Sequence, residues 1–268
     1  MLNTILSTIE TAEAENDRQF VVALARGLSI LYTIRFYPHG VSYQQICEMT
    51  QLPKPTVSRL LRTLVVLRFL RQNPHTSLYQ ADLRLLELTA GTNAVDPSEQ
   101  VRPLLANFAA NHHVSVSLAV AQYGEMLYVQ SIRSPARLAV QLQVGSTVPL
   151  PDTAIGRAYY AALNKEQRKA IQVDLKRLFP TKFDEKMAVL ERQEVFFNEH
   201  GFTLSDKEFS PDITAIAVTV KHPMAPHGIY SLNASVPVSR VSAETLIRDV
   251  AEPLKQLATE IQSHFIES

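Results

Sequence analysis

The chain is 268 residues long, carries no net charge at neutral pH and is 46% hydrophobic. This composition is typical of globular proteins, so it excludes a disordered or fibrous chain, and the length suits one large domain or two ordinary ones. The single cysteine, Cys47, excludes an intramolecular disulfide. No apolar run approaches the roughly 18–20 residues of a membrane span, and the N-terminus lacks the features of a signal peptide. We therefore expect a cytoplasmic protein with no membrane partner.

The charged residues are unevenly distributed along the chain. Residues 17–80 hold eight arginines and lysines but only two acids, Asp17 and Glu48, so this stretch has a net charge of +6 and the rest of the chain −6. A basic module on a mildly acidic body is typical of a DNA-binding protein with a separate regulatory domain. Chance clustering on a solvated face is the alternative.

The N-terminal region is predicted to be helical. Residues 1–17 are expected to form a flexible tail or a loose helix. Over residues 18–36 the apolar side chains follow the i, i+3, i+4, i+7 spacing of an amphipathic helix, which the Pro-His-Gly sequence at 38–40 ends. Ser42 is a suitable N-cap for a second, short helix, Tyr43–Met49.

A turn at residues 51–54 leads into a third helix, in whose first turn Pro55 is well placed. Its buried stripe is predicted to be Val57, Leu60, Leu61 and Leu64. Residues 69–80 alternate around a polar Asn-Pro turn, which indicates a β-hairpin. Three helices followed by a hairpin are the element order of a winged helix-turn-helix, which we expect over residues 18–81.

A linker helix is predicted at residues 82–97, followed by a second domain at 98–268. In this domain strands and helices alternate in blocks, which indicates an α/β sheet covered by helices. The predicted strands are 114–120, 126–132, 138–144, 213–220 and 228–236, and the predicted helices are 154–163, 165–179, 184–200 and 242–266. The expected fold class is thus a two-domain protein, α+β or α/β.

The third predicted helix carries side chains suited to DNA. A recognition helix buries one face and offers the other to the major groove, where arginine reads guanine and hydroxyls bond phosphates or bases. The predicted contacts on this helix are Lys54, Thr56, Ser58, Arg59 and Arg62. Tyr43 and Gln44 in the short helix, with Arg71 and Ser77 in the hairpin, complete the predicted set. A solvated basic face is the alternative for the helix, and a surface charge for Arg71.

Several segments resemble the IclR family of bacterial transcription regulators. Residues 52–64, Leu-Pro-Lys-Pro-Thr-Val-Ser-Arg-Leu-Leu-Arg-Thr-Leu, match that family's L-P-K-S-T-V-x-R-L-L-x-T-L except for Pro55 in place of Ser. Thr153-Ala-Ile-Gly-Arg-Ala resembles its T/S-A/G-x-G-K/R-A segment, and His200–Phe209 resembles its H-G-Y-x-x-x-D-x-E-x segment. The resemblance runs from about residue 18 to residue 265. It implies a DNA-binding regulator, more commonly a repressor, with a GAF-like effector-binding domain.

The resemblance also implies an effector site for a small organic metabolite, often a carboxylic acid or aromatic compound. The N-terminus of the helix at Ala154 would offer N–H groups to an anion. Carried over by position, the site residues are Thr153, Ala154, Ile155, Ser205 or Asp206, Ala215, Asn233 and Ser235. The family often has Cys at 215 and Ser at 233, so the effectors of relatives are not expected to transfer. Asn233 and Ser235 could instead lie on a solvated strand face, and Asp206 could cap a turn.

These features together predict a sequence-specific regulator without a cofactor. One winged helix buries too little surface for a specific site, so we expect a homodimer or tetramer, paired through residues 83–88, on a palindromic operator. An enzyme is the first alternative, but the sequence has no H-E-x-x-H, C-x-x-C, G-x-S-x-G or P-loop signature. The second alternative is a winged helix that pairs with proteins, for which the positive charge on the third helix and hairpin would be unnecessary.

Overall fold

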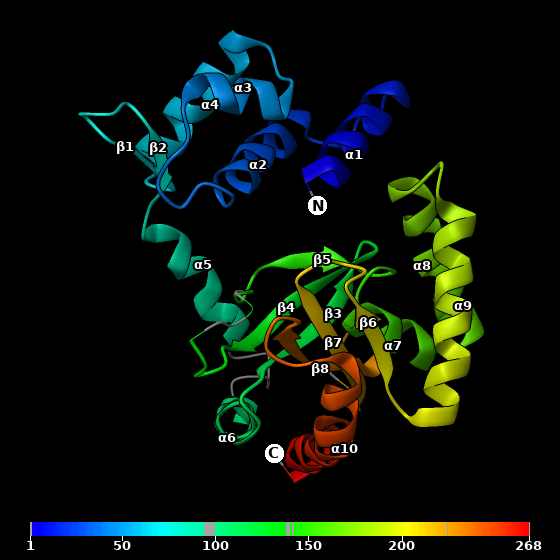
Figure 1. The fold of residues 1–268 in the computed structure, drawn as a ribbon. Coiled ribbons are helices and arrows are strands. Elements are labelled where there is room, and N and C mark those ends of the chain that lie inside the picture. Colours follow the sequence, from blue (N-terminus) through cyan, green and yellow to red (C-terminus); the bar gives the residue numbers. More distant parts are fainter. Residues whose placement is uncertain (1, 94–99, 138–139, 141, 224, 268) are drawn as a thin grey trace. The chain divides into compact units, whose positions relative to one another are not determined.

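The computed structural model describes residues 2–93, 100–137, 140, 142–223 and 225–267. The chain divides into two compact units, Met1–Ala94 and Val95–Ser268 (Figure 1). The predicted boundary between linker and second domain, at 97–98, lies outside the described residues. Among the helices that the structure describes, none is long and apolar enough to cross a bilayer.

The N-terminal unit is helical with one small hairpin. Its elements are α1 (Leu2–Ala14), α2 (Val22–Ile34), α3 (Tyr43–Thr50), α4 (Lys54–Val66), β1 (Leu70–Gln72), β2 (Tyr79–Ala81) and α5 (Arg84–Asn93). Strands β1 and β2 are antiparallel, with Arg71 opposite Gln80. The core of this unit consists of Ile30, Ile34, Val41, Ile46, Val57, Leu61, Leu64 and Leu70. This arrangement confirms the predicted winged helix-turn-helix.

Local sequence explains where the helix-turn-helix elements begin and end. The hydroxyl of Ser42 accepts a hydrogen bond from the N–H of Gln45, whose side chain accepts one from the Ser42 N–H, so α3 starts in a capping box. Gln51 ends α3 in the left-handed region, at φ 54°. A backbone bridge between Val41 and Tyr79 then ties the start of α3 to the hairpin.

Of the two forms predicted for the first residues, a flexible tail or a loose helix, the structure has the helix. Leu2–Ala14 forms α1, in which Ile9 and Ala12 are buried. Glu13 of α1 accepts a hydrogen bond from the guanidinium of Arg26, at 2.6 Å. A helix this short is marginal in isolation, so its packing against α2 supplies the stability that its sequence pattern does not reveal.

The C-terminal unit is built on one antiparallel six-stranded sheet with the order β5-β4-β3-β8-β7-β6. The strands are β3 (Ser115–Gln122), β4 (Glu125–Ile132), β5 (Thr147–Pro149), β6 (Thr203–Asp206), β7 (Ile213–Lys221) and β8 (Ile229–Pro237). The helices are α6 (Arg102–His112), α7 (Ala154–Ala162), α8 (Lys165–Leu178), α9 (Phe183–His200) and α10 (Ala243–Glu267). One core packs α6 and α10 against the sheet, and a second core packs α7, α8 and α9 against its other face.

One predicted strand does not form as expected. Of the predicted strand 138–144, residues 138, 139 and 141 lie outside the described residues, and the remaining four are not in a strand. The strand that follows β4 in the chain is β5, which begins after residue 144 and pairs with β4. The alternating pattern at 138–144 thus identifies apolar side chains, of which Val140 is buried, but not their backbone pairing.

The two faces of the sheet differ in side-chain size. Along β3, Val116 and Leu118 point into the core with α10, whereas Ser115 and Ser117 point the other way. Strand β8 repeats the pattern, because Asn233 and Ser235 alternate with apolar residues of the α10 core and pair with Ser117 and Ser115. In the middle of β3 and β8 the face toward α7 therefore carries small and polar residues, which leaves space beneath the N-terminus of that helix.

Candidate functional site

Helix α4 separates its apolar residues from its polar ones. Val57, Leu61 and Leu64 are buried, which fixes the orientation of the helix. The predicted contact residues lie away from that stripe: Lys54, Ser58, Arg59 and Arg62 are exposed, and Thr56 is half-buried. Pro55 occupies the first turn, as expected of a helix start. The outer face of α4 thus presents two guanidinium groups, an ammonium group and hydroxyls to solvent.

The start of α3 is attached to the start of α4. The hydroxyl of Tyr43 donates to the Lys54 carbonyl at 2.7 Å, and the amide of Gln44 donates to Glu48 at 3.0 Å. Tyr43, Gln44 and Lys54 line one hollow of about 550 Å³ between the two helices. The Tyr43 hydroxyl therefore connects the start of α3 to the start of α4, and Gln44 is the more exposed of the two predicted contacts on α3.

The hairpin presents its two predicted residues at separate places. Arg71 is exposed on β1, and Ser77 is exposed in the turn, where it adopts the left-handed conformation with φ 57°. Asn73 shapes this turn, because its side-chain oxygen accepts from the N–H groups of His75 and Thr76. The turn is thus locally ordered without burying Ser77.

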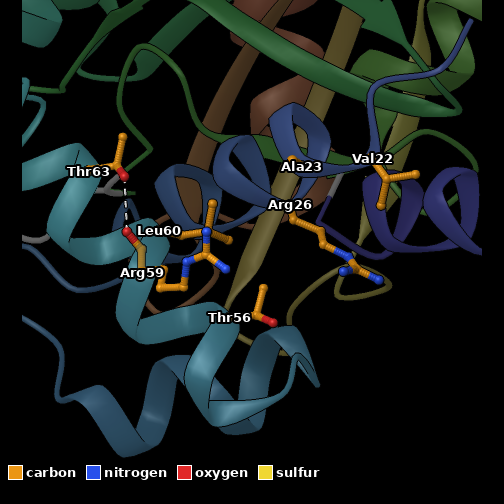
Figure 2. Close-up of a pocket in the computed structure, with 7 residues that line it drawn as sticks. All are labelled: Val22, Ala23, Arg26, Thr56, Arg59, Leu60 and Thr63. Atoms are coloured by element: carbon orange, nitrogen blue, oxygen red, sulfur yellow. Dashed lines mark hydrogen bonds between the residues drawn. The ribbon is translucent and has the colours of Figure 1, made fainter.

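A second hollow, of about 460 Å³, lies between α2 and α4 (Figure 2). Its lining brings Arg26 of α2 to the same surface as Thr56, Arg59 and Thr63 of α4. Arg26 is a candidate that sequence reasoning missed, because its position beside α4 depends on how the two helices pack. The signal available in the sequence was its membership of the basic stretch 17–80.

The C-terminal unit contains a small cavity between the sheet and the start of α7. Seven of the predicted effector residues line it: Thr153, Ala154, Ile155, Ser205, Ala215, Asn233 and Ser235, together with Tyr128, Val140, Leu142, Phe209 and Ile213. Asp206 does not line the cavity, because neighbouring residues of a strand point to opposite faces and Ser205 takes the inward position. The cavity volume is only about 20 Å³, so a larger ligand requires the lining to move.

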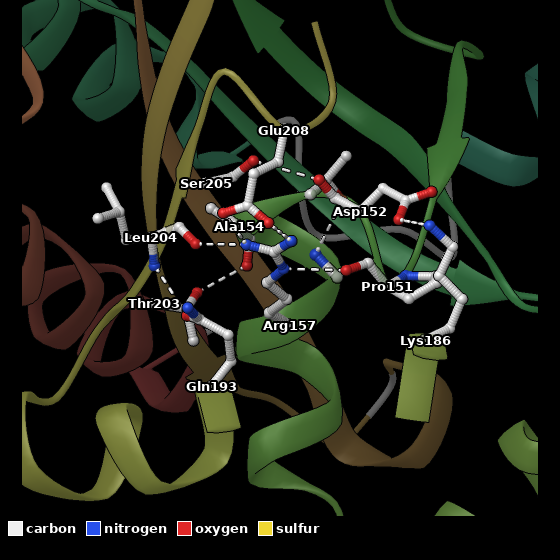
Figure 3. Close-up of polar contacts among 12 residues, drawn as sticks. Pro151, Asp152, Ala154, Arg157, Lys186, Gln193, Thr203, Leu204, Ser205 and Glu208 are labelled. Carbon is white, nitrogen blue, oxygen red and sulfur yellow. Dashed lines mark hydrogen bonds and ion pairs between the residues drawn. The ribbon is translucent and has the colours of Figure 1, made fainter. Parts of the chain in front are cut away.

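Helix α7 is held firmly over this cavity. The Thr153 hydroxyl caps the helix by accepting from the Gly156 N–H at 3.3 Å. Gly156 permits close packing, because a Cβ there would lie 2.1 Å from the Leu150 carbonyl oxygen. The Thr203 hydroxyl donates to the Ala154 carbonyl at 2.7 Å, which attaches α7 to β6 (Figure 3).

A buried arginine reinforces the same junction (Figure 3). The side chain of Arg157 is 1% exposed and donates to the carbonyls of Pro151 and Leu204. Both of its terminal nitrogens also contact the carboxylate of Glu208, at 3.0 and 2.5 Å. This bidentate pair joins α7 to the segment after β6, which includes the cavity residue Phe209.

The described residues contain no cluster of three or more histidine, cysteine, aspartate or glutamate side chains that could hold a metal ion. In the part of the cavity lining that the structure describes, no side chain is charged. The polar groups of the cavity are hydroxyls, one amide and the N–H groups of α7. Such a lining suits binding of a small molecule rather than acid–base or metal chemistry.

Comparison with known proteins identifies matches to both units. A family model described as the IclR helix-turn-helix domain matches residues 23–74, and one described as bacterial transcriptional regulator IclR C-terminal matches residues 91–263. The HTH-type transcriptional regulator TsaQ1/TsaQ2 of Comamonas testosteroni is 26% identical over 254 residues, which cover 93% of this chain and 90% of that protein.

Two crystal structures show the same fold over nearly the whole chain. An IclR family transcriptional regulator from Brucella abortus is 32% identical, with a TM-score of 0.78 and coverage of 97% of this chain and 98% of the other. An IclR homologue from Microbacterium hydrocarbonoxydans, crystallised with 4-hydroxybenzoate, is 21% identical, with a TM-score of 0.72 and coverage of 92% and 100%.

Proposed function

Because the chain belongs to the IclR family of bacterial transcriptional regulators, we propose that it binds a specific operator whose occupancy a small metabolite controls. The coarse assignment follows from the family: a DNA-binding helix-turn-helix domain and a C-terminal effector domain. The observation that supports the finer proposal is the exposed polar face of α4, where Arg59 and Arg62 lie opposite the buried stripe.

The operator contacts that we propose follow from this geometry. Arg59 and Arg62 are directed at base edges or phosphates, and Lys54, Thr56 and Ser58 at phosphates near the helix N-terminus. Gln44, Arg71 and Ser77 flank the site from α3 and the hairpin. We propose that Tyr43 helps to hold α4 in position, since its hydroxyl already donates to the Lys54 carbonyl.

The effector that we propose is a carboxylic or aromatic acid bound in the cavity beneath α7. Support comes from the N-terminus of α7, whose first N–H groups have no partner within the helix and favour an anion. Further support is that a relative with the same fold was crystallised with an aromatic acid, 4-hydroxybenzoate. Binding changes operator affinity only if the free and DNA-bound forms differ in affinity for the acid. We propose that operator binding by this protein represses transcription.

Self-association completes the proposal. Three leucines of the linker region, Leu83, Leu86 and Leu88, are 78%, 64% and 61% exposed in the chain alone. Leucines so exposed on one short segment favour pairing with a second copy. A homodimer, or a dimer of dimers, would then present two recognition helices to the two halves of a palindromic operator.

The test of the proposed function is selection of genomic DNA fragments by the purified full chain, carried out at two salt concentrations. We expect a short palindromic site to be enriched, with recovery falling steeply at the higher salt concentration. A variant with Arg59→Ala and Arg62→Ala is the matched control and should enrich nothing. Equal enrichment by both proteins would show that another face contacts DNA, and no enrichment with or without candidate acids would contradict the proposal.

A further inference from the structure

Most polar side chains around the cavity already use their hydrogen-bond donors within the protein. The hydroxyl of Thr153 donates to the Pro149 carbonyl at 2.9 Å, and that of Ser205 donates to the Asp152 carbonyl at 3.2 Å. The hydroxyl of Ser235 contacts the Ser115 carbonyl at 3.5 Å. These three residues therefore shape the cavity but do not demand a partner from a ligand.

Asn233 differs from them. The residue is only 5% exposed and lies on the face of β8 that lines the cavity, and its Oδ1 has no hydrogen-bond partner among the described residues. The amide also interacts with Tyr128, and this hydrogen bond partly offsets the rise in the pKa of Tyr128 that burial causes. Buried amide oxygens are nearly always paired, so an unpartnered one at a cavity wall indicates that a bound molecule completes it.

The neighbouring strand does not supply the missing donor. Ser117, directly opposite Asn233 on β3, contacts the hydroxyl of Ser131 at 3.1 Å. Because Ser131 donates its own proton to the Leu142 carbonyl at 2.7 Å, the proton between the two serines comes from Ser117. That donor is thus already used, and Asn233 Oδ1 is left facing the cavity.

The opposite wall of the cavity offers donors instead of an acceptor. Ala154 and Ile155 line it and occupy the first turn of α7, where backbone N–H groups have no carbonyl partner within the helix. The Thr153 hydroxyl satisfies Gly156, the next N–H along the chain. Since no described lining side chain is cationic, these N–H groups are the groups suited to an anionic end of a ligand.

We propose that the cavity selects an organic acid that also carries a hydroxyl group, with the carboxylate at the N-terminus of α7 and the hydroxyl donating to Asn233 Oδ1. This inference rests on the proposed function, in which the cavity is the effector site. It makes Asn233 the residue that distinguishes a hydroxylated acid from the same acid without the hydroxyl. A site built to pair a hydroxyl rejects the analogue that lacks it, because the buried acceptor is then left unpaired.

The experiment is titration calorimetry on the full chain with two matched pairs of acids, 4-hydroxybenzoate with benzoate and lactate with propionate. We choose an aromatic pair and a smaller aliphatic pair because the cavity is small, and the extent to which its lining moves decides which pair fits. We expect the hydroxylated member of at least one pair to bind about tenfold to a hundredfold more tightly than its partner. In Asn233→Ala this preference should disappear, whereas Ser235→Ala, the matched control on the same strand, should keep it.

Three results would overturn the inference: equal affinity within both pairs, a hydroxyl preference that survives in Asn233→Ala, or no binding of any of the four acids. Asn233→Leu, which removes the acceptor and nearly keeps the volume, replaces Asn233→Ala if that variant does not fold. Operator binding is measured on the same preparations with and without each acid. Absence of a hydroxyl preference in the wild type, with its operator binding intact, refutes only this inference, whereas absence of operator binding by the wild type both with and without acid refutes the proposed function.

Discussion

Arg59 and Arg62 show what residue-level reasoning from sequence can achieve. The helical period fixes which side chains of α4 are buried, so the exposure of both arginines follows once the helix is predicted. Arg26 lies beside Arg59 only because α2 packs against α4, and no local pattern reveals that contact. The cavity residues were found by resemblance and not from periodicity. Asp206 shows the limit of that route, since one step along a strand turns a side chain to the other face.

Arg59→Ala is predicted to weaken binding to the selected operator by about 1–3 kcal/mol, because a bidentate contact with a base contributes that much discrimination. Binding should be measured by fluorescence anisotropy on the operator and on duplexes changed at single positions, where the variant should also lose its preference at one position. Arg192→Ala, an exposed arginine of α9, is the control and should bind as the wild type does. Unchanged affinity in Arg59→Ala would show that this side chain does not face the DNA.

Glu208→Gln tests the buried Arg157. The substitution removes the negative charge beside a guanidinium that is 1% exposed, while the carbonyls of Pro151 and Leu204 remain in place. Because Glu208 itself is half-exposed, we expect a loss of only about 1–2 kcal/mol in the free energy of unfolding, measured with urea. Glu199→Gln, an exposed carboxylate 3.9 Å from the imidazole of His200, should change it by less than about 0.5 kcal/mol. Equal losses of unfolding free energy in the two variants would show that the ion pair between Arg157 and Glu208 contributes no more to stability than an exposed carboxylate does.

At the scale of elements, segments with a clear apolar period or a distinct cap were predictable, even where they are short. Helices α2, α3 and α4 and the hairpin follow patterns that extend over many residues or have distinct caps. Helix α1 was expected only as an alternative to a flexible tail, because its few buried residues, Ile9 and Ala12, become informative only with α2 present. The strand expected at 138–144 was wrong for a related reason. Alternation of apolar and polar residues indicates which side chains are buried, whereas backbone pairing also depends on the partner strand.

Two glycine-to-alanine substitutions in helices are expected to have opposite effects. In Gly156→Ala the new methyl group would meet the Leu150 backbone, so we expect a loss of about 1–3 kcal/mol or more as α7 moves away from it. In Gly27→Ala the nearest atom is a Leu60 methyl carbon at 3.8 Å, so higher helix propensity should stabilise α2 by up to about 1 kcal/mol. Thermal unfolding followed by circular dichroism measures both, and a stabilised Gly156→Ala would contradict the close approach of α7.

At the scale of the whole molecule, the charge distribution predicted that the DNA-binding domain and the regulatory domain are separate. The basic stretch 17–80 falls in the N-terminal unit, which has the helix-turn-helix. The sheet with its cavity lies in the C-terminal unit, outside that stretch. What the sequence could not supply is the space beneath α7, because that space results from small side chains on strands distant in the chain. The coupling that we propose between the two units depends on a difference in effector affinity between the free and DNA-bound forms, which is a property of the whole assembly.

Leu86→Lys is predicted to weaken self-association, because it places a charge among leucines that we propose to be covered by a second copy. Sedimentation equilibrium at micromolar concentration should show a dimer or tetramer for the wild type and a shift toward monomer for the variant. Val173→Lys, at an exposed apolar position of α8, is the control and should assemble as the wild type does. A monomeric wild type that binds its operator normally would contradict the proposed pairing.

The central claim is that the N-terminal unit recognises a specific DNA sequence. It is tested most directly by the affinity of the full chain for the selected operator and for a scrambled duplex of equal length, measured over a series of salt concentrations. We predict a preference of about 10³-fold or more for the operator and a steep loss of affinity for both duplexes as salt rises. Equal affinity for the two duplexes at every salt concentration would contradict the account.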